Sequence, residues 1–300
     1  MNALYLYHYT QKAELSETEW SSVMQTMFGR LDGNIRQVRT DPRITFSEFG
    51  TRRAASTDIH RRIYDILAGE LPGQCVGTSN VMLARERGDT NPRGTNAHEL
   101  RMIPTAFEDE PENIIEKMYA IDREWFAHFP HSGLLLPDTF GSSFYWKNCP
   151  RDIVQHHTGC RIDSKEPRVA IPEYLRFLES WGIDPKSKIA LPSDGLTYDV
   201  IEDTTNRFHA TLGMLTYGWG TELSNNTKGT FPKEKETFGP FGSMSIVIKP
   251  DAVWRPDRGE WVSCVKLSDN PTKAIGSPER IDLFRKTFGV AGMEAQKVVV

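Results

Sequence analysis

The sequence has little cysteine, and its four cysteines, Cys75, Cys149, Cys160 and Cys264, form no CxxC pair. Such sparse thiols do not suit a disulfide framework or a zinc site, so we expect reduced cysteines with structural roles. No apolar run approaches the roughly 18 residues that a membrane span needs. The opening stretch MNALYLYHYTQKAEL also lacks a basic segment ahead of an apolar one. These absences predict a soluble cytoplasmic protein that does not interact with membranes.

The chain also lacks an excess of positive charge. Its 36 lysines and arginines and 40 acidic residues give a formal net charge of -4, and the basic residues are dispersed. A nucleic-acid-binding protein needs a basic face, so we expect no nucleic-acid partner and only local recognition of small phosphorylated ligands. The pattern GxxxxGK[ST] is absent as well, which excludes a P-loop nucleotide site.

Short apolar segments that end in small, charged or hydroxylated residues recur along the chain. Side chains at the carboxyl ends of parallel strands converge on one face of a β/α barrel. The pattern therefore predicts an α/β enzyme built as an irregular, TIM-like β/α barrel. The segments are ITFSEFGTRR, QCVGTSNV, RGTNAHEL, LLLPDTF, GCRIDS, IALPSDG and LTYGWGT.

Apolar residues at helical spacing predict amphipathic helices between these segments. Ser56 and Thr57 suit the start of the first helix, and the acidic stretch 108–112 suits the start of the second. Gly182 and Pro185 end the third. The alternation of strand and helix is typical of parallel βα units. The stripes are Ile59, Ile63 and Ile66; Ile114, Met118, Ile121 and Trp125; and Ile171, Leu175 and Leu178.

The sequence changes character after Leu223. The stretch NNTKGTFPKEKETFGPFG has no hydrophobic period and is rich in Gly, Lys and Pro, which is typical of a loop or linker. After it, SIVIKPDAVW and EWVSCVKLSD flank PDRG, which indicates a β-hairpin. We therefore predict a β/α barrel domain over 1–225 and a linker over 226–243. Residues 244–300 would form the hairpin and the C-terminal part of a small sheet appendage.

Two glycine-containing motifs are candidates for holding a ring or a phosphate. In FSEFGTRR, a sharp turn at Gly50 would bring the ring of Phe49 near the guanidinium of Arg52, where an aromatic anion fits. The alternative is a core phenylalanine followed by solvated arginines. In GWGT, Gly218 and Gly220 would let backbone N–H groups approach a phosphate, and GTSNV is a second such candidate. A plain tight turn is the alternative for both.

His98, in GTNAHEL, is the one histidine within a strand-end cluster. The adjacent Glu99 is suited to orient its imidazole, so His98 is a candidate nucleophile, with a structural histidine as the alternative. Two other histidine groupings, His128 with His131 and the pair 156–157, lack a third ligand at convincing spacing, so we assign no metal site to them.

Three aspartates each follow an apolar run: Asp138, Asp163 and Asp194. On one rim they would bind ribose hydroxyls, or Mg²⁺ through water. Each would otherwise cap the helix that follows it.

Together and in this order, these motifs resemble nicotinate phosphoribosyltransferase, a type II phosphoribosyltransferase. The resemblance runs from about residue 45 to about residue 275 and includes GTSNV, GTNAHE, RIDS, SDG, GWGT and VKLSDNP. The family joins nicotinate to phosphoribosyl pyrophosphate, giving nicotinate mononucleotide and pyrophosphate in NAD salvage. The resemblance implies Mg²⁺, and ATP as a co-substrate whose hydrolysis is coupled through a phosphorylated histidine.

The resemblance also implies a role for individual residues. His98 would accept the phosphoryl group and, with Arg161 and Asp163, form the catalytic set. Arg161 would also hold the nicotinate carboxylate or the phosphates, and Asp163 would bind ribose. Ser79 stands where related nicotinamide enzymes are expected to have an aspartate, and a neutral residue there favours the nicotinate carboxylate because no like charge repels it. The other implied substrate-binding residues are Phe49 and Gly50 for the pyridine ring, Arg52 for its carboxylate or the phosphates, Asp138 and Asp194 for the pocket wall, and Gly218, Gly220 and Thr221 for the 5′-phosphate.

Two features depart from the family pattern. This chain reads DSKEP where the family usually reads DSGDP, so Lys165 occupies a glycine position and is expected to reshape the pocket. The chain also lacks the family's N-terminal portion, which a complementary N-terminal chain would supply. The resemblance further implies sites at a dimer interface, so we expect a homodimer. The alternatives to an active enzyme are one half of a split enzyme and a truncated, non-catalytic ligand-binding or regulatory remnant.

Overall fold

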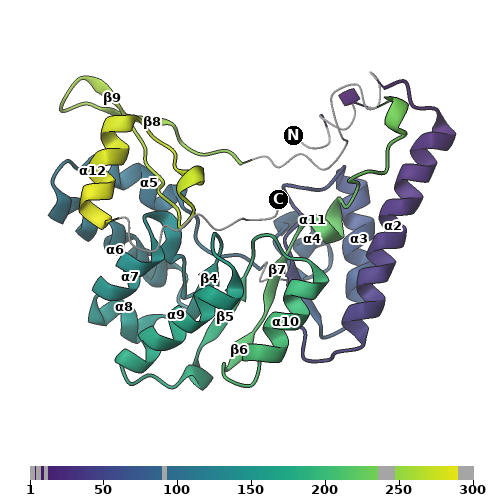
Figure 1. The fold of residues 1–300 in the computed structure, drawn as a ribbon, viewed down its shortest axis with the longest axis horizontal. Helices are drawn as coiled ribbons and strands as arrows, with labels where there is room; N and C mark the ends of the chain where they lie inside the picture. Colours follow the sequence, from purple (N-terminus) through teal and green to yellow (C-terminus); the bar gives the residue numbers. More distant parts are fainter. Residues whose placement is uncertain (1–3, 5–7, 10–12, 90–92, 236–246, 290–300) are drawn as a thin grey trace. The chain divides into compact units, whose positions relative to one another are not determined.

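The structure, a computed structural model, describes residues 4, 8–9, 13–89, 93–235 and 247–289 (Figure 1). The chain divides into two compact units that interleave along the sequence. The domain boundaries predicted from the sequence stay a prediction, and residues 236–246 of the linker and hairpin region lie outside the described residues. Unit 1 comprises Met1–Gly94, Leu196–Asn206 and Thr216–Val247, and unit 2 comprises Thr95–Gly195, Arg207–Leu215 and Ile248–Val300.

Unit 1 contains a three-stranded parallel sheet. Its strands are β1 (Phe46–Glu48), β2 (Cys75–Thr78) and β7 (Tyr217–Trp219), in the order β2-β1-β7. The rings of Phe46 and Trp219 meet edge to face, 5.6 Å between centroids, and join neighbouring strands through a fully buried contact. Because the strands are parallel, the segments that follow them leave the sheet at the same edge.

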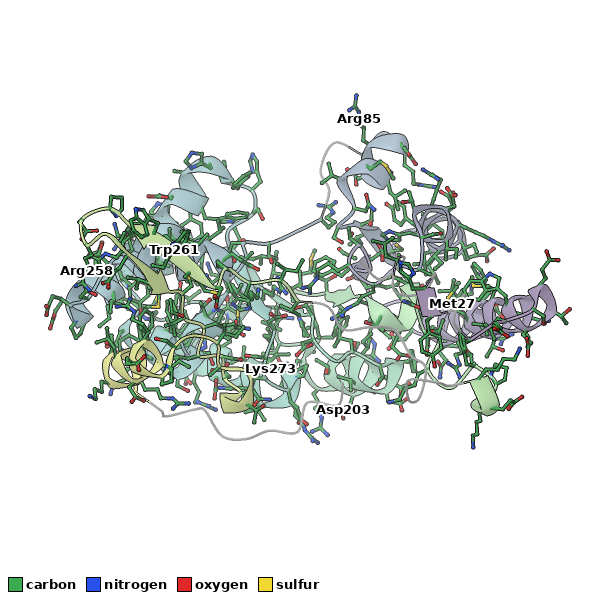
Figure 2. All side chains as sticks on the ribbon, turned by 90° about the horizontal axis from the view of Figure 1, so that it is seen from above. Met27, Arg85, Asp203, Arg258, Trp261 and Lys273 are labelled. Carbon is green, nitrogen blue, oxygen red and sulfur yellow. The ribbon has the colours of Figure 1, made fainter. Side chains whose placement is uncertain are left out.

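Helices cover this sheet within unit 1. The longest, α2 (Glu17–Arg39), begins at a capping box formed by Ser16 and Glu19 and buries one stripe that includes Met27 (Figures 1 and 2). Each fully buried aliphatic side chain of that stripe contributes roughly 1.5–3 kcal/mol. Ser56 caps the next helix by accepting from the N–H of Ile59, so the predicted helix there is confirmed. The others are α3 (Thr57–Glu70), α4 (Val81–Glu86), α11 (Thr221–Ser224) and α10 (Tyr198–Phe208), which continues past the unit boundary.

Unit 2 contains a four-stranded parallel sheet. Its strands are β3 (Leu134–Leu135), β4 (Gly159–Ile162), β5 (Ile189–Pro192) and β6 (Met214–Leu215), in the order β3-β4-β5-β6. Gly159 is required in β4 because a Cβ there would lie 2.3 Å from the carbonyl oxygen of Ile189. Two parallel sheets with intervening helices confirm the α/β class, and closure of the strands into a barrel stays a prediction.

The second and third predicted helices are confirmed in unit 2. In α6 (Pro111–His128) Ile114 and Met118 are buried, and in α9 (Pro167–Ser180) Ile171 and Leu178 are buried. Among the described helices, none combines the length and the apolar run needed to cross a membrane. The remaining helices are α5 (Glu99–Thr105), α7 (Ser142–Asn148), α8 (Arg151–His156) and α12 (Pro278–Phe288).

The predicted hairpin is present as β8 (Ala252–Arg255) paired antiparallel with β9 (Glu260–Ser263). It belongs to unit 2, where Asp109 accepts from the guanidinium groups of Arg255, Arg258 and Arg280. Figure 2 labels Arg258 and Trp261 on this hairpin.

Candidate active site

The segments that follow the three strands of unit 1 lie next to one another. The N–H of Phe49 donates to the carbonyl oxygen of Trp219 (2.8 Å), and the N–H of Ser79 donates to that of Glu48 (2.9 Å). A Cβ at Gly220 would lie 3.0 Å from the carbonyl oxygen of Phe49. The structure therefore gathers Phe49, Ser79 and Gly220 at one edge of the sheet.

Glycine at position 50 is required by this crowding. A Cβ there would lie 1.6 Å from the Oγ of Ser224, so only glycine allows the chain to pass. Beyond it, the Oγ1 of Thr51 lies 2.8 Å from the Oγ of Ser79, and Arg52 is exposed. The loop after β1 thus presents the hydroxyl of Thr51 beside Ser79.

The GWGT segment is divided between a strand and a helix. Gly218 is a buried residue within β7, opposite Ser47, and Gly220 leads into α11, which starts at Thr221. The backbone turn therefore lies at Gly220 rather than being shared by both glycines.

In unit 2, His98 stands at the start of α5 between two partners. Its Nε2 lies 3.0 Å from Asp163 Oδ2, and its Nδ1 lies 3.0 Å from Thr139 Oγ1. Burial lowers the pKa of His98 and outweighs the opposite effects of Asp138 and Asp163. The imidazole is therefore uncharged at neutral pH. Since a carboxylate only accepts, Nε2 carries the hydrogen and Nδ1 the lone pair.

Asp163, rather than Glu99, orients His98. Glu99 follows His98 directly and instead accepts from Lys249 Nζ at 2.7 Å, so the expected pairing with His98 is replaced. The side chains of consecutive residues at a helix start point to different sides of the helix. Glu99 is therefore next to His98 in the sequence without being directed toward its imidazole.

Arg161 and Asp163 project from β4 and its end as alternate residues, so they share one side of the strand. Arg161 donates through Nη2 to Asp163 Oδ1 (2.8 Å), through Nε to Ser193 (2.9 Å) and through Nη1 to Thr95 (2.9 Å). Burial pushes the pKa of Asp163 upward, but Arg161 and the His98 hydrogen bond outweigh it and hold that pKa well below its ordinary value. This carboxylate is ionised.

The other two aspartates have different surroundings. Asp138 is buried, accepts from Ser164 Oγ at 2.6 Å through Oδ2, and its Oδ1 has no hydrogen-bond partner among the described residues. Asp194 is more exposed and pairs with Lys273 Nζ at 3.0 Å. Of the three predicted aspartates, Asp138 and Asp163 are the two that accompany His98.

His98, Asp138 and Asp163 offer Mg²⁺ few ligand atoms that are not already hydrogen-bonded. Ligand atoms of His98, Asp138 and Asp163 lie within 4.8 Å of one another, but His98 and both oxygens of Asp163 already have partners. Mg²⁺ prefers oxygen ligands and often binds through one carboxylate together with water and substrate phosphates. Asp138 Oδ1 is the oxygen suited to that role.

Three residues around His98 and Asp163 were not identified as site residues from the sequence: Thr139, Ser193 and Lys266. Lys266 is buried, and its charge lowers the pKa of both His98 and Asp163. Thr139 and Ser193 stand beside predicted aspartates in LPDT and PSDG. Their positions at strand ends could therefore have marked them as candidate site residues. In unit 1 the missed residue is Glu48, a charged residue inside a buried strand.

Lys165 lies buried within unit 2. Its Nζ donates to both carboxylate oxygens of Glu173 (2.8 and 3.0 Å) and to Ser142 Oγ (3.1 Å), and lies 3.8 Å from Asp269. Its backbone is not among the described non-glycine residues with positive φ, so the glycine of the family pattern is not needed for conformation here. The ammonium instead serves as the counter-charge for two carboxylates.

We expect Lys165→Met to destabilise the fold by about 3 kcal/mol at pH 7, because it leaves the buried carboxylate of Asp269 and the half-buried carboxylate of Glu173 without a counter-charge. Burial raises the pKa of Asp269 to about 6, against the lowering effect of Lys165. A carboxyl whose folded pKa is raised stabilises fully below its unfolded pKa, near 3.9, and that contribution is lost as pH rises through about 6. Removing the ammonium raises this pKa further and extends the loss to higher pH.

Thermal unfolding midpoints between pH 5 and 8 measure this effect. Lys147→Met, at an exposed position of α7, is the matched control and should follow the wild-type curve. Parallel pH dependences for Lys165→Met and the wild type would contradict the assignment.

The comparisons with known proteins agree with these motifs. The sequence matches the model of the nicotinate phosphoribosyltransferase (NAPRTase) family over residues 44–291. The chain is similar to a nicotinate phosphoribosyltransferase from Porphyromonas gingivalis at 28% identity and a TM-score of 0.76, covering 96% of this chain and 69% of that one.

Two further solved structures are similar in fold. One is a nicotinate phosphoribosyltransferase from Vibrio cholerae (24% identity, TM-score 0.75, 89% of this chain and 61% of that one). The other is a putative nicotinate phosphoribosyltransferase from Saccharomyces cerevisiae (24% identity, TM-score 0.73, 97% of this chain and 67% of that one). The chain thus spans between 61% and 69% of the lengths of the three structures.

Proposed function

Because the chain belongs to the nicotinate phosphoribosyltransferase family, we propose that it joins nicotinate to phosphoribosyl pyrophosphate, giving nicotinate mononucleotide and pyrophosphate. The observation that carries the proposal is the contact of 3.0 Å between Asp163 and Nε2 of the buried His98, the histidine of the motif GTNAHE. A phosphoryl acceptor needs a lone pair in a fixed direction, and this arrangement supplies one. The proposal includes coupling to ATP hydrolysis through phosphorylated His98, a cytoplasmic location and self-association.

The loops of unit 1 would bind the pyridine ring and the 5′-phosphate. Phe49 stacks on nicotinate, Arg52 pairs with its carboxylate, and Ser79 leaves that carboxylate free of a like charge. Gly50 keeps the loop after β1 close to α11, where the backbone of Gly220 and the hydroxyl of Thr221 hold the phosphate. Gly218, inside β7, supports that turn from within the sheet.

The groups of unit 2 would serve the phosphoribosyl and phosphoryl chemistry. Asp163 would keep the hydrogen of His98 on Nε2, which leaves the Nδ1 lone pair free to react once the Thr139 hydroxyl turns aside. Nδ1 would then form a bond to the γ-phosphorus of ATP while the bond from that phosphorus to the β,γ-bridging oxygen breaks and ADP leaves. Water would later cleave the N–P bond and release phosphate, which completes the hydrolysis of ATP. Asp138 Oδ1 would hold Mg²⁺, which supplies charge neutralisation for the phosphates when bound. Arg161 keeps Asp163 ionised and in place, and Asp194 would bind ribose from the end of the neighbouring strand.

The transfer itself exchanges one bond at C1 of the ribose. The bond from C1 to the pyrophosphate oxygen breaks, its electron pair leaves with pyrophosphate, and the ring nitrogen of nicotinate forms the new bond to C1. The carbon acquires positive character on the way, so an ionised carboxylate such as Asp163 stabilises it. Stacking and pairing of the carboxylate hold the ring nitrogen in line.

Incubation of the chain with nicotinate, phosphoribosyl pyrophosphate, Mg²⁺ and ATP tests the proposal, with mononucleotide followed by mass spectrometry. The same assay is run with a candidate N-terminal chain added, which separates a self-sufficient enzyme from one half of a split enzyme. Nicotinate binding without product in either assay would favour a non-catalytic binding protein.

We expect Ser79→Asp to shift the substrate preference from nicotinate toward nicotinamide. A carboxylate at this half-buried position repels the nicotinate carboxylate and accepts from a carboxamide, so the KM for nicotinate should rise about 10-fold or more. Steady-state kinetics with both substrates measure the shift. Ser79→Ala, which removes the hydroxyl without adding charge, should keep the nicotinate preference, and equal selectivity in the two variants would refute the role.

A further inference from the structure

Glu48, the last residue of β1, has a fully buried carboxylate with four hydrogen-bond donors around it. Its Oε1 accepts from the N–H of Gly50 (2.5 Å) and from Ser224 Oγ (2.8 Å). Its Oε2 accepts from Thr78 Oγ1 (2.6 Å) and lies 2.8 Å from His60 Nε2. Two oxygens offer about four acceptor sites, so this charge is fully satisfied without water.

The direction of the contact with His60 follows from Asn80. The Oδ1 of Asn80 accepts from the N–H groups of Met82 (3.1 Å) and Leu83 (3.2 Å), so its Nδ2 is the atom 3.3 Å from His60 Nδ1. An amide nitrogen only donates, which makes His60 Nδ1 the acceptor. The hydrogen of the imidazole therefore lies on Nε2 and is donated to Glu48.

These contacts close a ring of four residues. The N–H of Asn80 donates to Thr78 Oγ1 at 3.0 Å, and Thr78 in turn donates to Glu48. Around the ring of Glu48, Thr78, Asn80 and His60, every donor faces an acceptor. All four contacts are at least partly buried. If one acceptor is replaced by a donor, two donors face each other, and no water is available to accept from them.

Three of the four partners of Glu48 come from the segments that carry the proposed nicotinate and phosphate residues, and the fourth, His60, lies in α3. Gly50 belongs to the loop after β1, Thr78 ends β2 immediately before Ser79, and Ser224 ends α11, the short helix that begins at Thr221. We propose that Glu48 is a positioning residue that holds these three loops in one arrangement and thereby sets the affinity for nicotinate. Its link to nicotinate rests on the function proposed above.

The test begins with Glu48→Gln, which keeps the shape and replaces one acceptor oxygen by a donor. The new amide faces either the Thr78 and His60 donors or the Gly50 and Ser224 donors. Losing one to two net hydrogen bonds should speed amide hydrogen exchange about 10-fold or more in segments 49–55, 79–84 and 220–225 together. The KM for nicotinate should rise about 10-fold, while kcat changes less than about 3-fold.

A compensating variant makes the test specific. In Glu48→Gln/Asn80→Asp the new amide donates to His60 Nε2, the imidazole hydrogen moves to Nδ1, and the new carboxylate accepts it while still capping α4. The two contacts of His60 are rebuilt with their hydrogens reversed at the same net charge. The backbone N–H of Asn80 still donates to Thr78, whose hydroxyl then accepts from the new amide as well. Exchange in the three segments and the KM for nicotinate should return to within about 3-fold of the wild type.

The matched control is Glu86→Gln, the same substitution at an exposed glutamate of α4 that pairs with Arg61. It should leave exchange and KM unchanged. If Glu48→Gln does not fold, Thr78→Val serves as the second variant, because it removes one donor of the ring. It should likewise speed amide hydrogen exchange in segment 79–84.

Two results would overturn the proposal. One is a lower unfolding midpoint with unchanged exchange in the three segments, which makes Glu48 a structural charge only. The other is faster exchange that Asn80→Asp does not reverse. A wild-type chain that neither binds nor converts nicotinate refutes the proposed function instead, while the exchange pattern still decides whether Glu48 holds the loops.

Discussion

Substituting His98 with glutamine is expected to abolish transfer of the γ-phosphoryl group of ATP to the chain. Glutamine keeps a polar side chain of similar length, but it has no ring nitrogen with a lone pair, which the imidazole presents at Nδ1 because Nε2 donates to Asp163. The transfer is measured by incubation with ATP labelled in the γ-phosphate. Phosphohistidine is then recognised because acid releases the label from the protein. Labelling should fall to background, and ATP-coupled turnover should fall with it.

The control for this variant is His156→Gln. His156 is an exposed histidine of α8 whose Nδ1 contacts only the carbonyl oxygen of Asp152 among the contacts described for it. This variant should take up the γ-phosphoryl label of ATP to the same extent as the wild type. Persistent labelling of His98→Gln would place the phosphoryl group on another residue and remove the central element of the proposed mechanism.

Replacing Asp163 with asparagine is expected to lower kcat by about 10²- to 10⁴-fold. The carboxylate accepts from His98 and Arg161 at once. Its loss no longer holds the imidazole hydrogen on Nε2 and leaves the half-buried guanidinium of Arg161 without its counter-charge. It also removes the negative charge that we assign to the stabilisation of C1. Steady-state kinetics and single-turnover labelling separate the loss in the transfer step from the loss in His98 phosphorylation.

Asp152→Asn is the matched control, because this aspartate of α8 pairs with Arg123 at the surface. Its kinetics should equal those of the wild type. If Asp163→Asn changed the unfolding midpoint but left kcat within about 3-fold, the role of Asp163 would be structural and the proposed chemistry would be wrong.

Helix positions and strand-end motifs were predictable because they depend on local spacing. The helix that begins after Ser56 needs only a capping hydroxyl and an apolar stripe, and both are visible in the sequence. The clustering of Phe49, Ser79 and Gly220 also followed from a general rule, since parallel strands that are neighbours end at the same edge. The assignment of roles to these residues stays a prediction.

The partners of charged side chains were not predictable. Glu99 stood next to His98 in the sequence, yet Asp163, which is 65 positions away, orients the imidazole. In the same way, the family pattern marked Lys165 as unusual without indicating that Glu173 and Ser142 would accept from it.

The sequence by itself determined the family, the α/β class, the confirmed helices and the list of chemical groups at strand ends, because each depends on residue type and short-range spacing. The tertiary structure alone decided that Asp163 holds His98, that Lys165 is the counter-charge of buried Asp269 and half-buried Glu173, and that Glu48 joins three loops. Hydrogen bonds act over about 3 Å in space, and which distant groups come within that distance depends on the packing of whole strands and helices.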